Sequence, residues 1–172
     1  MLQDHLTNNQ LDSNGLSKWA VFLPAISGFY ATFVGKQRQG PYVDPARMPA
    51  GIQDMEQMNW LNSQQALFPY CWSLYSGGHA NLDLNKPDAS EDMVRQRESG
   101  TLMLGDSGGF QIAKGLWEGD WKANSGCPKA QKRREAVLKW LDGICDYGMT
   151  LDIPTWVIHD KKAAGASVAA QQ

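Results

Sequence analysis

Two carboxylates and a pair of adjacent glycines are the residues of this sequence best suited to chemistry. Asp106 follows a short apolar run, and Asp152 lies near the end of a later one. The residues that follow Asp106 are Ser107, Gly108, Gly109, Phe110 and Gln111. Two carboxylates in one cleft can divide the work of nucleophile and of general acid or base.

The segment after Asp106 could also hold a flat ligand. Adjacent glycines let the backbone turn tightly and approach a ligand closely, and their N–H groups can face a ring edge or an anion. Phe110 could stack on a ring, while Gln111 offers a donor and an acceptor to its edge. A tight turn with Asp106 as an N-capping residue explains the same spacing without a ligand.

A βαβ unit would bring the two carboxylates together. The sequence predicts a strand over 101–104, a helix over 128–147 and a strand over 149–153. Such a crossover is right-handed and makes the strands parallel, so both strands end at the same edge of the sheet. In barrels and open α/β sheets, ligands bind at this edge, where Asp106 and Asp152 would lie.

The helix over 128–147 is the clearest in the sequence. Pro128 suits a first helical position, and Gly148 suits the C-terminal cap. Its predicted apolar stripe consists of Ala130, Val137, Leu138, Leu141, Ile144 and Cys145. Elsewhere, apolar runs predict buried strands at 19–23 and within 67–75. Helices are predicted over 51–65, from its helical spacing, and over 87–99, with Met93 and Val94 of the latter facing inward.

The hexapeptide from Asp106 to Gln111 (DSGGFQ) resembles the signature of the tRNA-guanine (queuine) transglycosylase family. In that family the next strand ends with an Asp that recognises the base, and Asp152 in TLDIP occupies this place. The resemblance covers about residues 66–160 and is weaker from 19 to 65.

The resemblance implies a TIM-type (β/α)8 barrel that exchanges guanine in nucleic acid for a 7-deazaguanine base. Most members act on tRNA, as in queuosine formation, and a related bacterial and phage branch modifies DNA. A complete barrel needs about 200–250 residues, whereas this chain has 172. We therefore expect an α/β fold equivalent to the N-terminal half of the barrel, with four to five strands over 18–160, between a flexible segment 1–17 and a disordered tail 161–172.

The resemblance also assigns roles to the motif. Asp106 resembles the family's catalytic acid/base Asp, Phe110 stands where an aromatic residue stacks on the base, and Asp152 resembles the Asp that hydrogen-bonds the edge of the purine. The residues expected to shape the pocket around them are Ser107, Gly108, Gly109 and Gln111.

Other positions depart from the family pattern. Gly105 stands where the family often has Thr, and Pro154 where its tRNA members usually have Cys, which favours a divergent branch. The family's nucleophilic Asp and its zinc site of three Cys and one His belong to the second half of the barrel. We therefore expect no metal or other cofactor in this chain. The chain is expected to be either truncated, or completed for the reaction by a second polypeptide or another copy of itself.

Composition and the remaining polar residues constrain the partners. A net charge of −2 excludes a basic field over the whole chain, so contact with tRNA or DNA would need local patches such as Lys129–Arg134, which is equally explained as a solvated helix face. His79, or His159 with Asp160, could reach the site or be ordinary loop residues.

The chain shows neither a signal peptide nor an apolar run long enough to cross a membrane, so we expect a cytoplasmic protein with no membrane partner. Two further interpretations stay open. The chain could be a non-catalytic partner that binds a base or nucleic acid, or a fragment of an unrelated barrel glycosidase with Asp106 and Asp152 as its acid/base pair.

Overall fold

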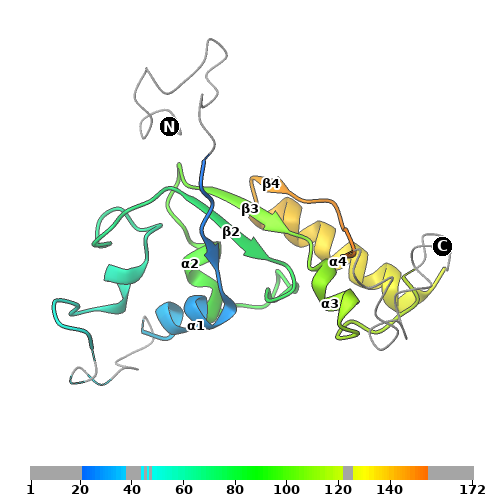
Figure 1. The fold of residues 1–172 in the computed structure, drawn as a ribbon, viewed down its shortest axis with the longest axis horizontal. Helices are drawn as coiled ribbons and strands as arrows, with labels where there is room; N and C mark the ends of the chain where they lie inside the picture. The colour runs from blue at the N-terminus through cyan, green and yellow to red at the C-terminus, as the bar shows by residue number, and fades with distance from the viewer. Residues whose placement is uncertain (1–20, 38–43, 45, 47, 122–125, 155–172) are drawn as a thin grey trace, which may run out of the picture. The chain divides into compact units, whose positions relative to one another are not determined.

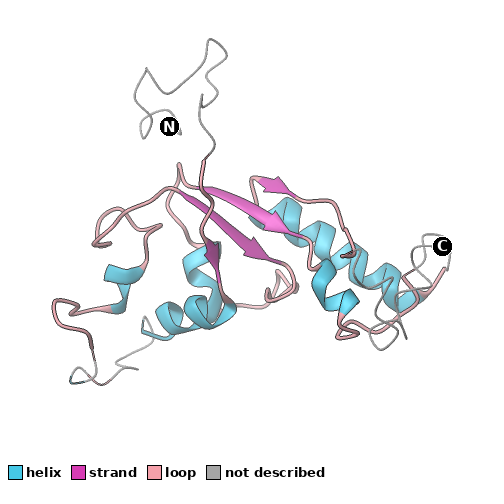
Figure 2. Ribbon diagram, in the orientation of Figure 1, coloured by secondary structure: helices cyan, strands magenta, loops and turns pink. Residues whose placement is uncertain are grey.

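The computed structural model describes residues 21–37, 44, 46, 48–121 and 126–154. Its strands form one parallel sheet in the order β1 (Ala25–Ile26), β2 (Trp72–Ser76), β3 (Leu102–Asp106) and β4 (Tyr147–Gly148). Its helices are α1 (Gly28–Gln37), α2 (Asp92–Arg95), α3 (Gly109–Ala113) and α4 (Pro128–Ile144), shown in Figures 1 and 2. The α/β class predicted from the sequence is confirmed.

The described residues fall into two compact units. The first comprises the described parts of Met1–Tyr75 and Pro87–Leu104, and the second those of Ser76–Lys86 and Gly105–Gln172. The last residue of β2 and the last two of β3 therefore belong to the second unit, together with α3, α4 and β4. The predicted terminal segments, 1–17 and 161–172, lie outside the described residues.

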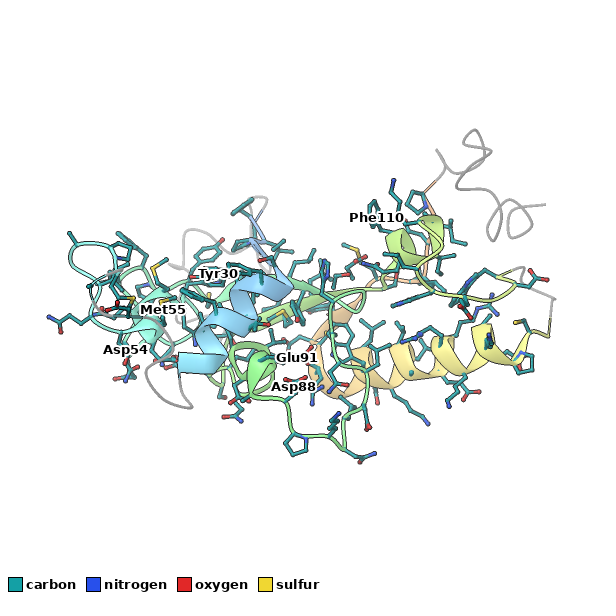
Figure 3. All side chains as sticks on the ribbon, turned by 90° about the horizontal axis from the view of Figure 1, so that it is seen from below. Tyr30, Asp54, Met55, Asp88, Glu91 and Phe110 are labelled. Carbon is teal, nitrogen blue, oxygen red and sulfur yellow. The ribbon has the colours of Figure 1, made fainter. Side chains whose placement is uncertain are left out.

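The first unit is held together by α1, α2 and the 3₁₀ helix η5 (Ala89–Glu91). Met93 and Val94 are fully buried, as predicted. Gly35 allows α1 to approach η5, because a Cβ at this position would lie 1.9 Å from the carbonyl oxygen of Ala89. The buried carboxylate of Glu91, labelled in Figure 3, accepts a hydrogen bond of 2.8 Å from Arg95 Nε, so its charge is paired.

The strand predicted over 19–23 is not found at residues 21–23, so the prediction is wrong there. Residues 19 and 20 lie outside the described part of the chain. Pairing begins instead at the Pro24 carbonyl, which accepts a hydrogen bond of 3.0 Å from the backbone N–H of Leu74. Proline has no N–H of its own to donate, so β1 starts after it and pairs Ala25 with Leu74 and Ile26 with Tyr75.

The helix predicted over 51–65 is also wrong. Only the 3₁₀ helix η4 (Met55–Met58) forms there, with Asp54 as its N-cap. Asn59 Oδ1 then accepts a hydrogen bond from the N–H of Leu61, and Asn62 Oδ1 from that of Gln64. Asparagine side chains that bond nearby N–H groups compete with helical bonding, so the apolar spacing does not produce a long helix.

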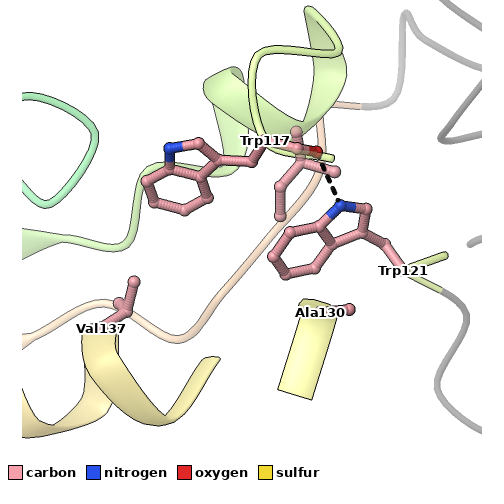
Figure 4. Close-up of a cluster of buried hydrophobic side chains, with 5 residues drawn as sticks. Trp117, Trp121, Ala130 and Val137 are labelled. Carbon is pink, nitrogen blue, oxygen red and sulfur yellow. Dashed lines mark hydrogen bonds between the residues drawn. The ribbon is translucent and has the colours of Figure 1, made fainter. Parts of the chain in front are cut away.

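The second unit has its core between α3, α4 and the loop that joins them. Figure 4 shows Trp117 and Trp121 above Ala130 and Val137 of α4, with Trp121 Nε1 donating a hydrogen bond of 3.1 Å to the Trp117 carbonyl. Trp140 is also fully buried, whereas Leu138 is 64% exposed, so its predicted place in the buried stripe is wrong. The buried face of α4 is centred on positions 130, 137 and 140.

The predicted strand over 149–153 and the predicted cap at Gly148 are both wrong. Helix α4 ends at Ile144, with Cys145 as its C-cap in an extended conformation, and β4 follows at once as Tyr147–Gly148. The N–H of Met149 donates to the Gly105 carbonyl at 2.8 Å. Residues 149–153 then run as a loop.

Candidate functional site

Asp106, the last residue of β3, is held by the end of β2. Ser76 Oγ donates a hydrogen bond of 2.5 Å to Asp106 Oδ2 and accepts one of 3.1 Å from the N–H of Gly78. The N–H of Gly77 donates to the Asp106 main-chain carbonyl at 2.8 Å. The carboxylate is therefore fixed at the carboxyl edge of the parallel sheet, the edge at which the sequence analysis expected it.

Gly108 and Gly109 connect this edge to α3. Gly108 has a φ of 80°, a left-handed conformation that favours glycine, and caps the start of α3. A Cβ on Gly108 would lie 2.6 Å from the Trp117 ring and 2.9 Å from the backbone nitrogen of Gly78. The loop after β2, with Gly78, and the loop after β3, with Gly108, thus pack directly against each other.

Asp152 reaches this site from the loop after β4. A Cβ on Gly109 would lie 1.5 Å from the Asp152 carbonyl oxygen and 3.4 Å from its Oδ1. The carboxylate is exposed. The structure thus brings Asp152 to the glycine pair, although it does so through a loop and not through the predicted strand.

Phe110 and Gln111 begin α3 with opposite exposures. Phe110, labelled in Figure 3, is 51% exposed. Lys114 Nζ lies 5.6 Å from the centroid of its ring. Gln111 is buried, and a Cβ on Gly78 would lie within 2.3 Å of its side-chain amide. Phe110 therefore remains about half exposed at the start of α3, while Gln111 supports the loop above it.

Two polar atoms of the motif are buried without a partner in the described part of the chain, namely Ser107 Oγ and Gln111 Oε1. Buried polar atoms in native proteins are nearly always hydrogen-bonded, and each exception calls for an explanation such as strain, a catalytic role, or a bound water or ion. Both exceptions flank the glycine pair.

Ser76 is a site residue that was not predicted, although the sequence holds a signal for it. It is the last residue of a strand-like run and precedes Gly77 and Gly78, so a parallel sheet places it at the same edge as Asp106. His79, which sequence reasoning considered, is exposed and its backbone N–H donates to the Ser76 carbonyl. His159 and Asp160 lie outside the described residues.

The glycine at position 105 is explained by packing. A Cβ at this position would lie 2.3 Å from Leu141 Cδ2 and 2.6 Å from Cys145 Sγ. The end of α4 therefore rests directly on β3, and a larger residue such as Thr would push it away.

The described residues contain no group of three or more His, Cys, Asp or Glu side chains arranged to hold a metal ion. Cys71, Cys127 and Cys145 are not joined by disulfides within the described residues. Burial raises the pKa of the Cys71 thiol, whereas backbone N–H groups at the start of α4, first that of Ala130, lower the pKa of Cys127.

These features define an α/β protein with a parallel sheet and a carboxylate-lined glycine loop at its carboxyl edge. No protein-family model, curated protein or solved structure matches the chain. Within the residues that the structure describes, every helix is too short or too polar to cross a membrane.

Proposed function

We propose that the second unit binds guanine or a 7-deazaguanine base, as part of a transglycosylase-like exchange of that base in tRNA or DNA. The observation that carries this proposal is the packing of Asp152 on Gly109, which places a second carboxylate beside the segment that holds Asp106 and Phe110. The parallel sheet is compatible with part of a TIM-type barrel, the fold that the proposal assigns to the chain.

The chemistry of the base matches the groups that the site presents. Guanine has adjacent ring and exocyclic N–H donors, and a carboxylate can accept both in a charge-assisted pair. We assign this contact to Asp152, whose carboxylate is exposed. Phe110 offers an exposed aromatic face for stacking, and base–aromatic stacking contributes about 1–3 kcal/mol per base.

Asp106 receives the role of general acid and base. When a nucleophilic carboxylate attacks the anomeric carbon, the departing guanine needs a proton, and the incoming base must lose one. The hydrogen bond from Ser76 Oγ orients Asp106 for this transfer. We assign the nucleophile to a segment outside these 172 residues, in a longer form of the same protein, a second polypeptide or another copy of the chain. The residues described here would then bind the base without completing the exchange.

Binding of 7-deazaguanine to the full chain, measured by calorimetry, tests the proposal. Asp152→Asn keeps the shape of the side chain but removes the charge, and we expect it to weaken binding at least about tenfold. Phe110→Ala should weaken it by a similar factor. Asp146→Asn and Phe68→Ala are matched controls, because both residues are exposed and lie outside the motif. Equal effects of the variants and their controls would contradict the proposal.

A second assay separates binding from catalysis. Labelled guanine is offered to the chain with tRNA and, separately, with double-stranded DNA, and we expect no incorporation into either polymer. Incorporation that Asp106→Ala abolishes would show that the chain supplies its own nucleophile and would overturn that part of the proposal. Base binding without exchange also fits a non-catalytic binding partner, so adding a candidate second polypeptide is the step that distinguishes the two.

A further inference from the structure

A cavity of about 550 Å³ lies in the second unit, between α4 and residues 149–153. Apolar side chains make up most of its wall, among them Leu138 and Leu141 of α4 and Met149 and Leu151 of the loop. Its volume falls within the range of small-molecule sites, which is about 300–1,000 Å³. Among the described residues, the wall includes Ser107 of the motif but not Asp106, Phe110 or Asp152, so the groups assigned to the base do not line this cavity.

Ser107 contributes an unused hydroxyl to this wall. The residue is fully buried, and its Oγ has no hydrogen-bond partner within the described part of the chain. A buried hydroxyl without a partner destabilises the fold. Its presence in the wall therefore points to an occupant that accepts or donates a hydrogen bond.

Arg134 adds a positive charge to the same wall. Its NH2 group donates a hydrogen bond of 2.7 Å to the Trp121 carbonyl, and the guanidinium lies 5.4 Å from the centroid of the Trp121 ring. These two contacts hold the charge in one position, and Trp121 itself lines the cavity. An occupant with a negative group is therefore favoured over a neutral one.

We propose that this cavity binds a small amphipathic carboxylate with an aliphatic body. The body packs against the leucine and methionine side chains, the hydroxyl of Ser107 hydrogen-bonds the head group, and Arg134 attracts its charge. The proposal is independent of base exchange and assigns a second ligand to the same unit.

The test compares decanoate with decan-1-ol, which has the same hydrocarbon body without the charge, by calorimetry on the full chain. We expect decanoate to bind at least about tenfold more tightly. Arg134→Gln should reduce decanoate affinity to that of the alcohol, and Ser107→Ala should weaken both ligands several-fold. Lys139→Gln is the control, because Lys139 is an exposed cation of α4 that does not line the cavity.

Thermal unfolding of each variant checks that it folds. A second pair of variants tests the shape of the cavity without changing its polar groups. Leu138 and Leu116 are 64% and 68% exposed, but only Leu138 lines the cavity. Leu138→Trp should narrow the cavity and weaken decanoate binding, while Leu116→Trp should leave it unchanged.

Three results would overturn the proposal. The first is no binding of decanoate, or equal binding of decanoate and the alcohol. The second is an equal loss in each variant and its control, which would indicate attachment to the general surface. The third is competition between decanoate and 7-deazaguanine, which would place both ligands in one site. If the full chain binds decanoate but not 7-deazaguanine, the result contradicts the proposed function and leaves the cavity proposal in place.

Discussion

Asp106 depends on a serine from the neighbouring strand for its position. Ser76 Oγ both donates to its carboxylate and accepts from the backbone of Gly78, so one hydroxyl links the ends of two strands and the loop beyond. A carboxylate held in this way loses little rotamer freedom when a ligand binds, which is the advantage of a preorganised site. Asp152 is positioned through its main chain, by the close approach of its carbonyl oxygen to Gly109.

The cysteines give a residue-scale prediction about pH. Hydrogen bonds from backbone N–H groups, first that of Ala130 and then that of Asp120, lower the pKa of Cys127, whereas burial raises the pKa of Cys71. The thiolate is the reactive form. At a pH below the ordinary thiol pKa, Cys127 should therefore react faster with iodoacetamide than Cys71, and its rate should level off at a lower pH.

The measurement is alkylation followed residue by residue with peptide mass spectrometry across a pH series. Cys127→Ser should remove the fast phase and leave the slow one. A Cys71 rate equal to that of Cys127 at every pH would contradict the assigned environments.

At the scale of elements, close approach of backbones shapes the site. We expect Gly109→Ala to lower the free energy of unfolding by about 1–3 kcal/mol, because the new methyl group would overlap the Asp152 carbonyl oxygen and force the loop away. The same variant should lose affinity for 7-deazaguanine, since the displaced loop carries Asp152. Urea unfolding gives the stability change.

Gly143→Ala is the matched control for this prediction. Gly143 lies within α4, and a Cβ there would meet only the end of the Leu84 side chain, at 2.9 Å. Because alanine favours a helix over glycine by about 1 kcal/mol, this variant should be neutral or more stable. Equal destabilisation by the two variants would show that the approach of Asp152 to Gly109 is not specific.

Elements whose signal is local could be predicted from the sequence. The sequence predicts β3 and α4 because an apolar run and a helical stripe after proline specify them independently of the rest of the chain. It does not predict α1, or the loop that stands in place of the strand expected over 149–153. Gly35 against Ala89 and Gly109 against Asp152 are contacts between distant residues, which local patterns do not reveal. The helix expected over 51–65 failed for the opposite reason, since Asn59 and Asn62 redirect the backbone locally.

The candidate site was more predictable than the strands that carry it. Asp106 lies at the end of a parallel strand as expected, and Asp152 comes to the same glycine pair although its strand does not form. Chain order and the βαβ connection are enough to bring the two segments to one edge. The hydrogen bond from Ser76 was not foreseen, because only the register of β2 and β3 reveals it.

At the scale of the whole molecule, charge limits how a nucleic acid could bind. The net charge is −2, so a polymer must be held by local cations such as those of Lys129–Arg134. Lys129 is paired with Glu118 at 2.8 Å, whereas Lys132 is exposed on the same helix. We expect Lys132→Gln to weaken binding of a single-stranded oligonucleotide and to reduce the slope of log K against log salt by about 0.7.

Fluorescence anisotropy of a labelled oligonucleotide over a salt series measures that slope. Lys86→Gln, which removes an exposed cation outside α4, should leave the slope unchanged. An unchanged slope in Lys132→Gln would show that this face of α4 does not contact phosphates and is only solvated.

Discrimination between purines tests the central claim most directly. If a carboxylate reads the adjacent N–H groups of guanine, the full chain should bind guanine most tightly, hypoxanthine less tightly because it lacks the exocyclic amine, and adenine at least about tenfold more weakly than guanine. Calorimetric titration of the three bases under one set of conditions gives this order. Equal affinities for guanine and adenine, or no binding of guanine, would contradict the account.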